Sequence, residues 1–108
     1  MKNKIKNKGE YSCAMEWFEN GQKELEANFK DGKPDGLMTT WFESGQIESK
    51  VNFKNGNLHG LSTYWFENGK KNAEMNYKDD KLDGLATTWF ENGQKEIEEF
   101  YKNDELIS

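Results

Sequence analysis

Glutamates are the side chains in this sequence that could carry acid–base chemistry. A glycoside hydrolase needs two carboxyl groups, one of them held in an apolar pocket that raises its pKa. Here the glutamates alternate with other residues along short segments, a pattern typical of an open surface that offers no such pocket. We therefore expect no enzymatic activity and no catalytic residue. The recurring positions are Glu24, Glu26, Glu48, Glu74, Glu96, Glu98 and Glu99.

Metal-binding and nucleophilic side chains are sparse. His59 is the only histidine, so one chain cannot assemble a histidine-based triad or a zinc cluster. Cys13 is the only cysteine and occupies the repeat position that leucine holds elsewhere, which predicts a small apolar side chain. The aspartates in Gly-containing segments lack the ligand spacing of a calcium loop and are typical of turns. We expect no metal and no cofactor.

The elements that must position these side chains follow a repeat of 24 residues. Each copy contains Trp-Phe-Glu, then Asn or Ser, then Gly. A period of this length indicates stacked supersecondary units, because one unit cannot bury its apolar face alone. The recurring residues are Trp17, Trp41, Trp65 and Trp89, then Phe18, Phe42, Phe66 and Phe90, and the turn glycines Gly21, Gly45, Gly69 and Gly93.

Each repeat is predicted to be a β-hairpin. Two β-rich segments are separated by a Gly-containing turn, and such turns recur too often for helices of ordinary length. The fold class we predict is all-β: an elongated antiparallel meander of four tandem 24-residue β-hairpin repeats forming a single-sheet twisted ribbon. The repeats are residues 13–36, 37–60, 61–84 and 85–108, preceded by residues 1–12 as a basic N-terminal tail or degenerate half-repeat.

The pairing register can be predicted from the turn. With Glu43–Gly45 as a three-residue loop that ends in a left-handed glycine, Trp41 shares a face with Val51 and Phe53. The same parity predicts one structural core on the Trp side of the sheet. Its predicted members are Trp17, Trp41, Trp65, Trp89, Phe29, Phe53, Tyr77, Leu37, Leu61 and Leu85.

The four phenylalanines that follow the tryptophans point the other way. Two interpretations of this Phe row stay open: an exposed patch that marks a partner site, or a second small core where the ribbon curls on itself. The candidate partner-binding residues are Phe18, Phe42, Phe66 and Phe90 with their neighbours Thr40, Tyr64 and Thr88.

The charge of the chain argues against nucleic acid and membrane surfaces as partners. The net charge is -5, and four of the fifteen cations lie in the first eight residues, which leaves the repeats more acidic than the total suggests. An acidic body repels phosphates and anionic lipid, and the chain contains no arginine. With no long apolar segment and a lone cysteine, we expect a cytoplasmic protein.

The recurring Gly-Leu-x-x-x-Trp-Phe-Glu-Asn-Gly-Gln motif over residues 13–106 resembles the bacterial variant of the MORN repeat, the YwqK-like group labelled as toxin–antitoxin antitoxins. The resemblance implies β-hairpin arrays used in protein association. Our leading hypothesis is a non-catalytic protein-binding module, with antitoxin-like neutralisation of a basic partner as its sharper form. The alternatives are carbohydrate or small-ligand binding on the aromatic faces, and a structural array that self-associates through its sheet edges.

Overall fold

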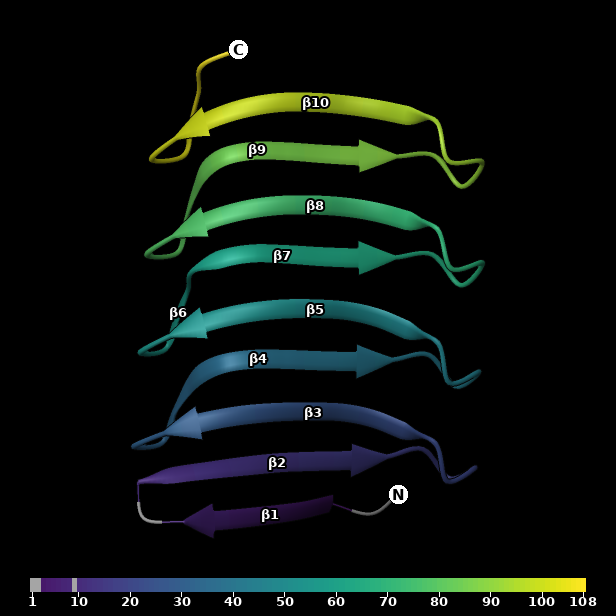
Figure 1. Cartoon of the computed structure of the whole chain (residues 1–108), viewed down its shortest axis with the longest axis vertical. Helices are drawn as coiled ribbons and strands as arrows, with labels where there is room; N and C mark the ends of the chain where they lie inside the picture. Colours follow the sequence, from purple (N-terminus) through teal and green to yellow (C-terminus); the bar gives the residue numbers. More distant parts are fainter. Residues whose placement is uncertain (1–2, 9) are drawn as a thin grey trace.

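The computed structural model describes residues 3–8 and 10–108, which form one antiparallel sheet of eleven strands. Figure 1 shows the strands stacked in chain order from the N-terminus to the C-terminus. The sheet measures 43 × 32 × 13 Å, so it is a single layer. The strands are β1 (Asn3–Lys8), β2 (Tyr11–Trp17), β3 (Lys23–Lys30), β4 (Lys33–Trp41), β5 (Ile47–Lys54), β6 (Asn57–Leu58), β7 (Gly60–Trp65), β8 (Lys71–Lys78), β9 (Lys81–Trp89), β10 (Lys95–Lys102) and β11 (Glu105–Leu106). The predicted fold class, an open all-β meander of tandem hairpins, is confirmed.

Three-residue loops join the two long strands within each hairpin. Phe42 N donates to Gln46 O at 2.8 Å, and Gly45 N donates to Phe42 O at 2.9 Å. Gly45 has φ +96°, a left-handed conformation that glycine adopts without a steric penalty. The expected loop over Glu43–Gly45 is therefore present.

Two-residue turns join one hairpin to the next. Asn55 and Gly56 have φ values of 50° and 88°, which is the pattern of a type I′ turn. Asp79 and Asp80 occupy the same turn of the following repeat with φ values of 49° and 69°. These positive values explain why Asp, Asn and Gly recur between hairpins, since these residues tolerate the left-handed region best.

A β-bulge follows every three-residue loop. Trp41 pairs with Ile47, but the next residue, Thr40, pairs with Ser49, so one residue of β5 has no partner. The same shift occurs in the other three hairpins. The unpaired residues in the four bulges are Glu24, Glu48, Asn72 and Glu96.

The bulge makes the predicted face assignment wrong. Val51 pairs with Met38, and Phe53 pairs with Gly36, instead of lying on the side of Leu37 and Trp41. One extra residue reverses the side of the sheet to which each later residue points. We call the two sides the Trp face, with Trp17, Trp41, Trp65 and Trp89, and the Phe face, with Phe18, Phe42, Phe66 and Phe90. Phe29, Phe53 and Tyr77 therefore lie on the Phe face.

Small side chains, not the large ones we expected, form the most buried positions. Among the described residues the buried side chains are Ala27, Thr39, Ser49, Ser62, Thr63, Ala73, Ala86 and Thr87. Leu37, Leu61 and Leu85, predicted as core, are 38%, 42% and 45% exposed. The four tryptophans, with Phe29, Phe53 and Tyr77, are half-buried. A one-layer sheet has no second layer to cover its large side chains, so these lie over their small neighbours and stay partly in solvent.

Candidate functional site

The Phe row runs across the sheet at the ends of β2, β4, β7 and β9. Phe18, Phe42 and Phe66 are half-buried, whereas Phe90 is 49% exposed. Each phenylalanine directly follows a tryptophan, so strand alternation turns it to the Phe face. The gaps from Phe18 to Phe42 and from Phe42 to Phe66 stay open, as the two cavities described next show, so this part of the row does not form a closed second core.

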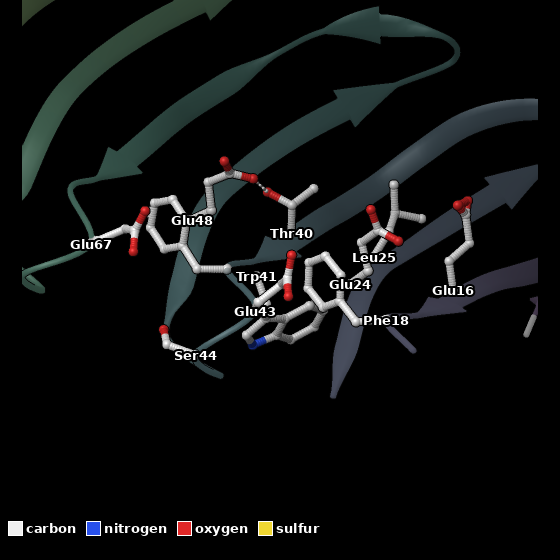
Figure 2. Close-up of a pocket in the computed structure, with 11 residues that line it drawn as sticks. Glu16, Phe18, Glu24, Leu25, Thr40, Trp41, Glu43, Ser44, Glu48 and Glu67 are labelled. Atoms are coloured by element: carbon white, nitrogen blue, oxygen red, sulfur yellow. Dashed lines mark hydrogen bonds between the residues drawn. The ribbon is translucent and has the colours of Figure 1, made fainter. Parts of the chain in front are cut away.

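The first cup is a cavity of about 580 Å³ between Phe18 and Phe42. Glutamates from β2, from two successive loops and from two bulges converge on it, and no lysine lines it. Figure 2 shows these carboxylates together with the Phe18 ring, and Glu67 extends from the loop of the next repeat. Its lining residues are Glu16, Phe18, Glu24, Leu25, Thr40, Trp41, Phe42, Glu43, Ser44, Glu48 and Glu67.

The bulges bring two of these glutamates into the cup. Glu48 Oε1 accepts a 3.0 Å hydrogen bond from Thr40 Oγ1, drawn as the dashed line in Figure 2. The Thr40 hydroxyl also lies 2.6 Å from the Ser49 hydroxyl, and this second hydrogen bond holds the Thr40 side chain in place. Within residues 10–108, the Oε1 atom of Glu24 is buried and has no hydrogen-bond partner. The cup thus contains an oriented carboxylate and one that lacks a donor.

The second cup repeats this arrangement one hairpin further along the sheet. It has a volume of about 620 Å³ and lies between Phe42 and Phe66. Phe42, Glu48 and Glu67 line both cups, so the two cavities are neighbours in a continuous row. The other residues lining the second cup are Ser49, Tyr64, Trp65, Phe66, Asn68, Asn72 and Glu91.

The structure brings most of the predicted partner-binding residues into these cups. Thr40 lines the first cup and Tyr64 the second, together with three of the four row phenylalanines. Thr88 and Phe90 lie in the last hairpin, outside both cups. Sequence reasoning placed Glu24 and Glu48 on an open strand face and missed their role as cup walls. The bulge places both glutamates there, and the alternation of residue types along β3 and β5 does not indicate it.

The Trp face carries lysines over its aromatic rings. Lys23 Nζ lies 5.5 Å from the ring centroid of Trp41, and Lys71 Nζ lies 5.8 Å from that of Trp89. Both lysines also pair with a glutamate of their own strand, at 2.7 Å for Lys23 and 2.6 Å for Lys71. The rings of Trp41 and Trp89 are thus engaged by side chains of the protein, which makes these two tryptophans less suited to a stacked ligand.

Two further observations concern metals and membranes. Among the described residues, no three His, Cys, Asp or Glu side chains are grouped as ligands of a metal ion would be. The same part of the chain contains no helical segment with the length and apolar character needed to cross a bilayer.

Comparisons with known proteins identify the repeat. A family model described as "MORN repeat variant" matches residues 13–31, 34–55, 58–79 and 82–103. Each matched segment covers the three-residue loop, and consecutive segments are joined at the two-residue turns. Searches of curated proteins and of solved structures found no match to this chain.

Proposed function

The chain belongs to the MORN repeat variant family, and on that premise we propose that it is a non-catalytic protein-binding module whose partner docks on the Phe face. Repeats of this family generally serve as interaction or structural modules. The observation that carries the proposal is the row of two acidic cups walled by the repeated phenylalanines. Partly exposed aromatic rings grouped on one face are the kind of patch that marks a partner site.

The charge of the cups favours a basic partner. Six glutamates line the two cups, and neither cup is lined by a lysine. The salt-bridged lysines of the hairpins lie on the opposite side, where Lys23 and Lys71 pair with Glu26 and Glu74. A cationic protein would therefore meet an uncompensated negative potential on the Phe face, which raises its association rate and fixes its orientation.

Antitoxin-like neutralisation is the sharper form of the proposal. In this form the acidic row covers the basic active surface of a toxin in the bacterial cytoplasm. The cups support it because they present carboxylates at regular intervals. The single free Cys13 is compatible with the reducing compartment that this role requires.

Affinity capture from the native cell with matched variants tests the proposal. Phe42→Ser/Phe66→Ser removes the walls of both cups, and Leu37→Ser/Leu61→Ser removes two exposed apolar side chains from the Trp face. We expect the first double variant to lose a partner that the wild type and the second retain, with all three giving the same far-ultraviolet circular dichroism. Identical partners for all three would rule out the Phe face as the docking surface.

A further inference from the structure

We infer that the two cups bind successive arginines of an extended polyproline II segment that carries an arginine at every third residue. The inference rests on the proposed function and specifies the partner of the same site. It follows from three properties of the described residues: the spacing of the cups, the aromatic walls, and the carboxylates that converge between them.

The spacing of the cups favours the polyproline II conformation. One repeat adds two strands, so neighbouring cups lie about 9.6 Å apart at about 4.8 Å per strand. A polyproline II segment has three residues per turn at about 3.1 Å each, so every third side chain points the same way at intervals of about 9.3 Å. In a β-strand the third residue points to the opposite side. An α-helix presents side chains on the same face about every 10.5 Å, over seven residues, which matches the spacing of the cups less well than the polyproline II interval does.

The walls and floor of the first cup suit a guanidinium group. Phe18 and Phe42 provide ring faces on which a planar cation can stack. The Thr40 hydroxyl already orients Glu48 to receive an N–H from it. Glu24, Glu43 and Glu67 add further carboxylates to the lining of the same cup. Arginine presents several donors in a fixed fork that matches carboxylates, whereas lysine presents a single charged nitrogen.

The cups are also placed for simultaneous occupation. Phe42 stands between them, and Glu48 and Glu67 line both. Two arginines in neighbouring cups would therefore lie on opposite sides of one ring and near the same two carboxylates. Binding at the first cup brings the next arginine to the second, so the two contacts reinforce one another through a high effective concentration.

Fluorescence anisotropy with three labelled peptides of equal charge tests the inference. Each contains four arginines: at every third residue among prolines, clustered at one end of the same prolines, or at every seventh residue of an alanine-rich helix. We expect the period-three peptide to bind at least about tenfold more tightly than either other peptide, since its spacing alone lets two guanidinium groups form charge-assisted hydrogen bonds in neighbouring cups at once. Equal affinities, tighter binding of the helix, or binding of none would overturn the inference. The capture experiment with the Phe42→Ser/Phe66→Ser variant decides the proposed function separately.

Charge-matched variants assign the binding to the cups. Glu48→Gln/Glu67→Gln removes two charges that line both cups, and Glu10→Gln/Glu105→Gln removes two exposed charges that line neither. For the period-three peptide we expect a loss of about tenfold or more from the first pair and less than about threefold from the second, because exposed charges contribute little. Equal losses would show that net charge, not the cups, holds the peptide, and would overturn the assignment.

Discussion

Asn20 Nδ2 donates a 3.0 Å hydrogen bond to the carbonyl oxygen of Glu43, which lies in the loop of the next repeat. Asn20 Oδ1 accepts from Gln22 N at 2.9 Å, so the same amide also closes its own loop. Asn68 repeats both contacts, to the Glu91 carbonyl at 3.0 Å and from Lys70 N at 2.9 Å. The amide at this repeat position therefore ties consecutive loops together along the edge of the cups.

The second repeat has Ser44 at this position, and this difference yields a first prediction. The Ser44 hydroxyl accepts from Gln46 N at 3.3 Å, but it has no amide N–H that could reach the Glu67 carbonyl. We expect Ser44→Asn to raise the free energy of unfolding by about 0.5–1.5 kcal/mol, the net value of a typical hydrogen bond. Urea denaturation followed by tryptophan fluorescence measures it. Ser44→Ala serves as the control, and an Asn variant no more stable than wild type would contradict the prediction.

A second prediction concerns the asparagines of the Trp face. Asn52 Nδ2 donates a 2.8 Å hydrogen bond to the carbonyl of Leu61 near the start of β7. Asn28 and Asn76 do the same for Leu37 and Leu85, each at 3.0 Å. We expect Asn52→Ala to lower the free energy of unfolding by about 0.5–1.5 kcal/mol, the net value of a typical hydrogen bond, because it removes the donor to the Leu61 carbonyl. Lys54→Ala, an exposed change in the same strand, should cost much less in the same urea titration, and similar costs would speak against the role of the amide.

A third prediction is a loss of stability at high pH. Burial raises the pKa of the Tyr77 phenol above its ordinary value of 10.0, with further contributions from Tyr64 and Asp104. The unfolded chain therefore releases this proton at a lower pH than the folded protein does. Stability from the neutral phenol is complete below pH 10.0 and is lost as the pH rises through the folded pKa.

Urea titrations followed by circular dichroism across this alkaline range measure the effect. We expect the free energy of unfolding of Tyr77→Phe to fall less steeply above pH 10.0 than that of the wild type. The difference between the two proteins isolates the contribution of Tyr77, because the rest of the chain is the same in both. Parallel curves would show that Tyr77 does not contribute to the decline.

The sequence allowed the architecture to be predicted but not the faces of the sheet. Trp41 and Gly45 recur with a fixed period, which was enough to predict the hairpins and the three-residue loops. The bulge at Glu48 could not be predicted, since a glutamate fits an exposed strand position as well as a bulge. The bulge changed the face of every later residue of β5, so Phe53 was assigned to the wrong face. Leu37 was predicted as buried for a different reason: the sheet has no second layer to cover its large side chains.

The candidate site could be predicted only in part for the same reason. Phe42 and Thr40 lie outside the bulged segment, and their placement on the Phe face follows from simple alternation along β4. Glu24 and Glu48 reach the first cup because they are the extra residues of the bulges. Glu67 comes from a loop in another repeat, so its position depends on how the hairpins stack, which one repeat alone does not reveal.

The strands follow one another in the sheet in chain order, with only the short β6 off that path. A chain lengthened by one whole repeat would therefore extend the Phe row without altering the hairpins before it, whereas losing a single residue from a strand would shift the pairing of that hairpin with its neighbours. The length of the Phe row therefore changes by whole repeats. The length of partner that the sheet contacts could then evolve by one repeat at a time, with the residue types of each repeat unchanged.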